Sequence, residues 1–178
     1  MKTIEENLTQ YAAYHRDRRN IATHLFGVPL IVFSIVLALS VLVIPMGPVS
    51  TTVAVIAVVA STLYYLKLDL AFGVTMAITF FAMCAISSEM TARLTALATL
   101  GWAAGIFAFG WALQFWGHKF EGMKPAFFDD AKQLLIGPIF IVAEIYFFLG
   151  AKTALRRYIE DRVGPTVARR EHPVASRP

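Results

Sequence analysis

The chain has 178 residues, of which 57% are hydrophobic and 16% are charged, whereas soluble domains carry about 25% charged residues. This composition excludes an ordinary soluble domain and predicts an integral membrane protein. The formal net charge of +4 comes from Lys and Arg gathered at the two ends of the apolar region, a pattern typical of membrane orientation signals and not of a nucleic-acid-binding surface.

The first predicted element is an amphipathic helix from Ile4 to about Arg18. Its apolar side follows helical spacing through Ile4, Leu8, Tyr11 and His15. Such a helix lies on the bilayer surface, so we expect residues 1–20 to form an interfacial element. Asn20 precedes an apolar run and is predicted to be the N-cap of the next helix, which places His24 one turn inside that helix.

Five apolar segments follow, and they predict an all-α fold, a polytopic transmembrane helical bundle of four to five such segments within residues 21–152. They lie at about 25–44, 49–66, 70–87, 97–116 and 134–149. A membrane-spanning helix needs about 20 residues, within a range of roughly 17–25, so the first four qualify and the last is marginal.

Both ends of the apolar region are basic, and the positive-inside rule therefore places both in the cytoplasm. An odd number of crossings would separate them, so we expect one segment to be re-entrant or packed without crossing. The last segment is the best candidate because it is short and contains Gly137, Pro138 and Glu144. Residues 153–178 are expected to form a basic, disordered tail.

Three of the four histidines, His15, His24 and His118, are predicted to reach the same membrane face. Glu121 lies three residues after His118, on the same side of a continued helix. Histidines with one carboxylate and open positions suit non-haem Fe(II), and three histidines also suit zinc. A single interfacial histidine is more often a satisfied amphipathic residue, but three with Glu121 predict a metal site.

His15 and His24 are nine positions apart and would point to opposite sides of one continuous helix. Both can bind one ion only if the helix breaks between them. We expect that break at Arg18-Arg19-Asn20.

Several other polar residues have both a structural and a functional interpretation. Glu144 is an ionisable residue in an apolar segment, and such residues usually have a function. It could equally be a structural carboxylate, or a carboxylate that accepts a hydrogen bond from the N–H of a ligand histidine. Arg16 and Lys124 could hold a substrate carboxylate, but snorkelling to lipid head groups is commoner. Gln114 could hydrogen-bond a ligand or substrate, and Asp129 is most simply a helix cap.

Two groups of residues form paired signatures. The first runs from Tyr14 to His24 and is followed by Gly27 and Pro29. The second comprises Trp111, Gln114-Phe115, Gly117-His118, Glu121-Gly122, Lys124-Pro125-Ala126, Asp129, Gly137-Pro138 and Glu144. In this order, over about Tyr11–Glu144, they resemble a membrane family whose characterised eukaryotic members are 2-hydroxy fatty acid dioxygenases.

The resemblance implies that Fe(II) and O2 are used to shorten a 2-hydroxy fatty acid by one carbon during α-oxidation. It points to His15, His24 and His118 as iron ligands, and we choose Glu121 as the carboxylate that joins them. The expected catalytic set is Glu121, Glu144, Arg16 and Lys124. The expected supporting or substrate-contacting set is Asn20, Gln114, Tyr14 and Asp129.

The expected partners are the lipid bilayer and a 2-hydroxy fatty acid, without nucleic acid, and a homo-oligomer is compatible with the sequence. The expected location is a bacterial inner membrane or the endoplasmic reticulum, with the metal site facing the cytoplasm. Three alternatives stay open: a transporter or channel that uses Glu144, a haem protein with two axial histidines, and a non-catalytic membrane scaffold.

Overall fold

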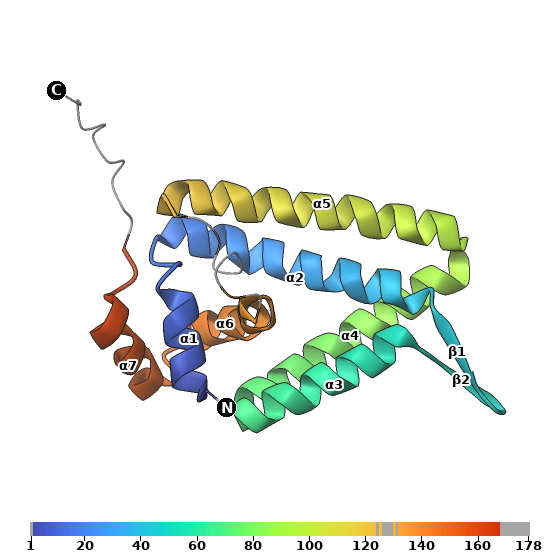
Figure 1. The fold of residues 1–178 in the computed structure, drawn as a ribbon, viewed down its shortest axis with the longest axis horizontal. Helices are drawn as coiled ribbons and strands as arrows, with labels where there is room; N and C mark the ends of the chain where they lie inside the picture. Colours follow the sequence, from blue (N-terminus) through green and yellow to red (C-terminus); the bar gives the residue numbers. More distant parts are fainter. Residues whose placement is uncertain (1, 124, 126–129, 131, 168–178) are drawn as a thin grey trace. The chain divides into compact units, whose positions relative to one another are not determined.

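The computed structural model describes residues 2–123, 125, 130 and 132–167, and it forms two compact units (Figure 1). One unit combines residues 1–26 with residues 112–178, and the other comprises residues 27–111. The elements in chain order are α1 (Ile4–Ala12), α2 (Arg18–Ser40), β1 (Val43–Met46), β2 (Val49–Thr52), α3 (Val53–Leu68), α4 (Leu70–Arg93), α5 (Ala96–Glu121), α6 (Gln133–Phe148) and α7 (Thr153–Val163). The prediction of an all-α class with apolar helices and an N-terminal helix is confirmed.

Among the described residues, three helices are long and apolar enough to cross a membrane, namely α2, α4 and α5. The axes of α6 and α7 are bent by 111° at the break between the two helices. The two helices are either one broken span, which would be the fourth, or a re-entrant loop. α3 has 16 residues, or about 24 Å of helix, which is shorter than the roughly 30 Å of a bilayer core.

The N-terminal helix α1 begins at a capping box. Thr3 accepts a hydrogen bond from the amide of Glu6, and the Glu6 carboxylate accepts one from the amide of Thr3. Ile4, Leu8 and Tyr11 are buried residues of α1, and this helix contacts α6 and α7 (Figure 1). The predicted apolar spacing therefore covers a protein core, and an interfacial position for α1 stays a prediction.

The break between the first two helices lies earlier than predicted. α1 ends at Ala12, and a turn from residue 13 to residue 17 precedes α2. The Asp17 carboxylate accepts a hydrogen bond from the amide of Arg19 at 2.8 Å, which satisfies one free amide of the first turn of α2. The predictions of a helix to Arg18 and of Asn20 as N-cap are thus wrong, because Asp17 serves that end and Asn20 lies inside α2.

The basic segment after residue 152 is not disordered throughout. Residues 153–163 form α7, and Ile159 is buried at 2% exposure. α7 ends at Gly164, which has a φ of +81° and donates its amide to the Glu160 carbonyl. The expectation of a disordered tail is therefore wrong for α7, and residues 168–178 lie outside the described residues.

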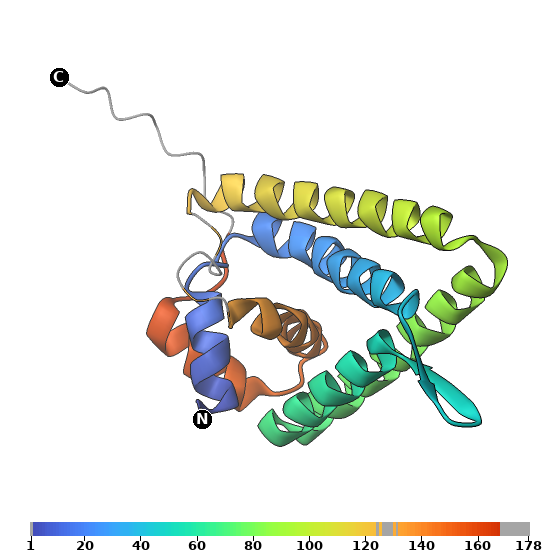
Figure 2. The same cartoon turned by 45° about the vertical axis from the view of Figure 1, so that its right-hand side comes forward.

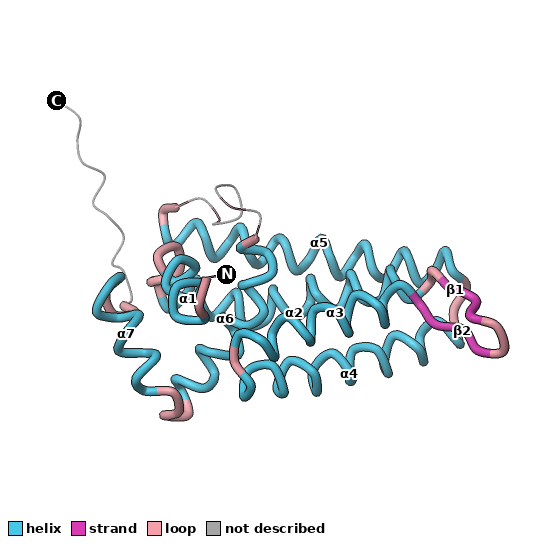
Figure 3. The backbone as a smooth tube through the Cα atoms, turned by 60° about the horizontal axis from the view of Figure 1, so that its bottom comes forward, coloured by secondary structure: helices cyan, strands magenta, loops and turns pink. Residues whose placement is uncertain are grey.

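The second unit contains a helical hairpin and a β-hairpin (Figures 2 and 3). Asp69 lies between α3 and α4, and its carboxylate caps α4 through the amide of Phe72. β1 and β2 pair antiparallel around Gly47, whose φ of +67° suits a two-residue hairpin loop. The segment predicted as one span at 49–66 is thus a strand followed by a shorter helix, because its first residues extend the β-hairpin.

Candidate metal centre

Three buried histidines come together in the first unit. His15 lies in the turn after α1, His24 in the second turn of α2, and His118 in the last turn of α5. Their exposed fractions are 1%, 1% and 6%, and one ligand nitrogen from each lies within 4.8 Å of the other two. The convergence that the sequence predicts is therefore present, and it brings residues from three separate elements to one point.

The two N-terminal histidines face each other through the same ring nitrogen. Nε2 of His15 lies 3.1 Å from Nε2 of His24. Their Nδ1 atoms lie 2.8 Å from the Tyr11 carbonyl and 2.9 Å from the Asn20 carbonyl. A carbonyl only accepts hydrogen bonds, so each Nδ1 carries the proton and each neutral ring presents an Nε2 lone pair. Two lone pairs this close repel each other unless a cation lies near both, which fits a metal ion.

The environment of His15 favours the neutral, ligating imidazole over imidazolium. Burial lowers the pKa of His15 well below its usual value, and the nearby His24 lowers it further. The Tyr11 ring stacks on the His15 ring with centroids 4.1 Å apart and an interplanar angle of 2°. Phe140 of α6 lies against both rings. The imidazole therefore packs against aromatic side chains and is buried away from water.

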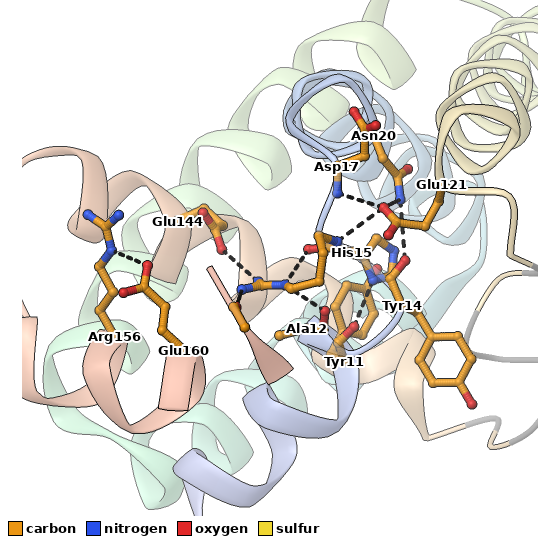
Figure 4. A network of polar contacts seen from close by, with 12 residues as sticks. Tyr11, Ala12, Tyr14, His15, Asp17, Asn20, Glu121, Glu144, Arg156 and Glu160 are labelled. Atoms are coloured by element: carbon orange, nitrogen blue, oxygen red, sulfur yellow. Dashed lines mark hydrogen bonds and ion pairs between the residues drawn. The ribbon is translucent and has the colours of Figure 1, made fainter. Parts of the chain in front are cut away.

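Glu121 lies outside the group of mutually close ligand atoms. Its Oε2 accepts hydrogen bonds from the amides of Arg16 at 3.0 Å and Asp17 at 2.8 Å, and from the Asn20 side chain at 3.2 Å (Figure 4). The expected role of Glu121 as a metal ligand stays a prediction. Through Oε2 the carboxylate anchors the turn that carries His15 to the end of α5.

Gly117 allows α2 and α5 to approach closely beside the histidines. A Cβ atom at Gly117 would overlap the Thr23 hydroxyl and would lie 2.5 Å from Oδ1 of Asn20. Any larger residue would push the two helices apart. The residue before His118 thus sets how near His118 can come to His24.

The guanidinium of Arg16 forms hydrogen bonds and an ion pair within the protein. Its Nε donates to the carbonyls of Ala12 and His15 at 2.9 and 3.0 Å, and its Nη1 donates to the Gly164 carbonyl at 2.9 Å. Its Nη2 lies 3.8 Å from Oε1 of Glu144, in an ion pair whose Arg16 side chain is buried and whose Glu144 side chain is partly exposed (Figure 4). Both side chains line a cavity of about 420 Å³ whose apolar wall includes Leu25 and Phe147. These contacts favour a positioning role for Arg16.

The remaining predicted residues separate into three groups. Gln114 is buried at 5% exposure one turn before His118, and its Nε2 has no hydrogen-bond partner among the described residues. Tyr14 contributes its carbonyl, which accepts from the Asn20 side chain at 3.4 Å. Lys124 and Asp129 lie outside the described residues.

Sequence reasoning missed three residues that shape the centre. Tyr11 precedes His15 by one helical turn, and this spacing is a signal that was visible in the sequence. Gly117, next to His118, is the small residue that a close helix crossing needs. The part played by Asp17 had no sequence signal, because it depends on where α1 ends.

The same packing argues against a haem between two of these histidines. The ring centroids of the three pairs are 4.6, 4.9 and 5.0 Å apart. A porphyrin plane has no space between imidazoles whose nitrogens lie 3.1 Å apart.

Comparison of the sequence with known proteins shows which family the chain belongs to. The model of the family described as "2-hydroxy-palmitic acid dioxygenase Mpo1-like" matches residues 1–149, a region that holds all three clustered histidines. The chain belongs to the Mpo1-like family. It is also 32% identical, over 162 residues, to the 2-hydroxy-palmitic acid dioxygenase MPO1 of Saccharomyces cerevisiae, covering 88% of this chain and 87% of that protein. No solved structure matches the chain.

The region matched by the Mpo1-like family model includes the elements that carry the three histidines. The matched region contains α1, the His15 turn and the ends of α2 and α5 that carry His24 and His118. It stops before α7, so α7 and the segment after it lie beyond the family model.

Proposed function

We propose that this chain is a membrane-embedded dioxygenase that uses Fe(II) and O2 to shorten 2-hydroxy fatty acids by one carbon. The observation that carries the proposal is the buried group His15, His24 and His118, with ligand nitrogens within 4.8 Å of one another. Membership of the Mpo1-like family and the activity for which the yeast relative is named support the choice of substrate class.

The reaction balances without a further reductant. One 2-hydroxy acid and one O2 give the acid one carbon shorter, CO2 and water, so the substrate supplies all four electrons that O2 takes up. When bound, Fe(II) would supply the activation of O2 that breaking the C1–C2 bond requires. His15, His24 and His118 would hold the ion through one imidazole nitrogen each.

The surrounding residues would orient these imidazoles. The carbonyls of Tyr11 and Asn20 fix the ring positions and tautomers of His15 and His24. Glu121 holds the turn before α2 through the amides of Arg16 and Asp17. A site whose ligands are held by main-chain contacts keeps its geometry when substrate enters.

Gln114 would contact the substrate's polar end. Its amide nitrogen is buried without a partner among the described residues, and an unmade hydrogen bond at a buried donor is costly. The 2-hydroxyl and carboxylate of a 2-hydroxy acid offer the acceptors that it lacks. The acyl chain would extend among apolar side chains of the membrane-embedded part.

The site would face the cytoplasm. Arg16, Arg18 and Arg19 lie beside His15 at the start of α2, and basic residues at the end of a membrane span favour the cytoplasmic side. A cysteine introduced at Arg18, which is exposed, would test this through labelling by a membrane-impermeant thiol reagent from either side of oriented vesicles.

The decisive experiment measures product formation by the purified protein. The protein in detergent is incubated with Fe(II), O2 and 2-hydroxypalmitate, and the acid one carbon shorter is detected by mass spectrometry. We expect product from the wild type and none from His118→Ala. His172→Ala changes the one histidine outside the family-matched region and should keep activity. Absence of product from the wild type, or undiminished product from His118→Ala, would refute the proposal.

A further inference from the structure

The segment Gly164–Val167, which follows α7, pairs with the turn that carries His15. Val167 donates its amide to the Arg16 carbonyl at 2.9 Å, and its carbonyl accepts from the Arg18 amide at 3.1 Å. These bonds make a short parallel bridge opposite Asp17. The Gly164 carbonyl also accepts from the Arg16 guanidinium at 2.9 Å. We call residues 164–167 the strap.

The strap and Glu121 hold the same turn through different atoms. Glu121 accepts from the amides of Arg16 and Asp17, whereas the strap bonds the Arg16 carbonyl and the Arg18 amide. The Arg16 guanidinium connects the strap to His15 directly, because it also donates to the His15 carbonyl at 3.0 Å. His15 therefore sits in a short turn whose main chain is fixed from two directions.

We propose that the strap is a positioning element that holds His15 in place for Fe(II), so that residues beyond the family-matched region set the iron affinity. This inference rests on the proposed function, since it requires that the three histidines bind Fe(II). Its physical basis is that the strap bonds the main chain on both sides of Asp17, at the Arg16 carbonyl and the Arg18 amide, one residue beyond His15. When the strap is released, the turn occupies other conformations, and the apparent affinity equals the intrinsic affinity multiplied by the fraction of molecules that keep His15 in place.

The test compares Fe(II) binding by the wild type and by five variants in detergent under anaerobic conditions, with Fe(II) alone as the probe. A chain that ends at Val163 loses the strap, and a chain that ends at Ala168 keeps it. Val167→Pro removes the amide that donates to Arg16, and Val167→Ala retains that amide. Hydrogen exchange at the Arg18 amide reports separately, without metal, whether the strap is docked.

We expect the chain ending at Val163 to bind Fe(II) about tenfold more weakly, and Val167→Pro at least about threefold more weakly, since each lost hydrogen bond contributes modestly. The chain ending at Ala168 and Val167→Ala should bind within about twofold of the wild type. Exchange at the Arg18 amide should accelerate in the chain ending at Val163. Phe80→Leu changes a buried residue of α4 in the other unit and should lower thermal stability without changing Fe(II) affinity.

Two results would overturn the inference while leaving the proposed function intact. Unchanged Fe(II) affinity in the chain ending at Val163 would show that the strap does not position His15. Equal weakening by Phe80→Leu and Val167→Pro would show that affinity follows general stability. Failure of the full chain to bind Fe(II) would instead refute the proposed function, and the strap's role in metal binding with it.

Discussion

Glu121 and Asp17 are 104 positions apart in the sequence, yet the Glu121 carboxylate accepts a hydrogen bond from the Asp17 amide at 2.8 Å. The same oxygen accepts from the neighbouring Arg16 amide, so one side chain at the end of α5 fixes the main chain beside His15. Glu121 was expected to be a metal ligand, and this contact suggests a different way in which its loss would affect the site.

Replacing Glu121 should lower stability and iron binding, and the loss should be smaller when the new side chain keeps an oxygen that accepts hydrogen bonds. Glu121→Ala leaves two buried amides without partners and should lower the free energy of unfolding by about 2–4 kcal/mol. Glu121→Gln keeps one oxygen acceptor and should cost less. Chemical denaturation in detergent and iron content measure the two effects. A Glu121→Gln protein of normal stability that holds no iron would favour direct ligation over anchoring.

Gly117→Ala should separate α2 from α5. Its Cβ would overlap the Thr23 hydroxyl, so we expect a loss of about 2 kcal/mol or more of stability and a lower iron content. Gly105→Ala lies in the same helix with no atom within 4 Å of the added Cβ, and it should be neutral or slightly stabilising. Thermal unfolding with iron analysis compares the two, and equal effects would contradict the close-approach argument.

Metal binding should stabilise the folded protein through the three histidines. At a free Fe(II) concentration 100 times the Kd, the gain is about 2.7 kcal/mol, which thermal unfolding can detect. His15→Ala and His24→Ala should abolish this gain, and chelation should reverse it in the wild type. Metal analysis of protein purified without a histidine tag identifies the ion, and a stabilisation that survives all three histidine replacements would place it elsewhere.

Gln114→Ala should separate substrate binding from metal binding. The variant loses a buried donor that has no protein partner among the described residues, so stability should change little. The KM for 2-hydroxypalmitate should rise about tenfold if one hydrogen bond to a charged group is lost, while iron content stays normal. A fall in kcat with unchanged KM would argue that Gln114 supports the reaction and not the binding of substrate.

The parts of the fold that depend on composition and periodicity were predictable. The apolar segments follow from hydrophobic patterning, and His15, His24 and His118, which were expected at one membrane face, lie together in the structure. The point at which α1 ends was not predictable, because His15 continues the helical spacing of Ile4, Leu8 and Tyr11. The contacts with Glu121 and with the strap, which hold the turn at residues 13–17, come from distant parts of the sequence.

The roles of individual polar residues were harder to predict than their positions. Glu121 and Arg16 were correctly placed near the histidines, but a sequence does not show whether a carboxylate faces an ion or a main-chain amide. That choice depends on side-chain directions set by the approach of α2 to α5 at Gly117. α7 was misjudged because its charged residues resemble a solvated tail, whereas Ile159 is buried.

The unit that contains the histidines is built from the two ends of the chain, with residues 27–111 inserted between them. During synthesis, Arg16 is made 105 positions before its carboxylate anchor. At about 5–20 residues per second this interval lasts about 5–20 s, so the first two imidazoles wait while the intervening helices are made. If the three histidines bind Fe(II) as proposed, loading with iron belongs to the final stage of biogenesis, because a chain that stops before His118 lacks the third ligand.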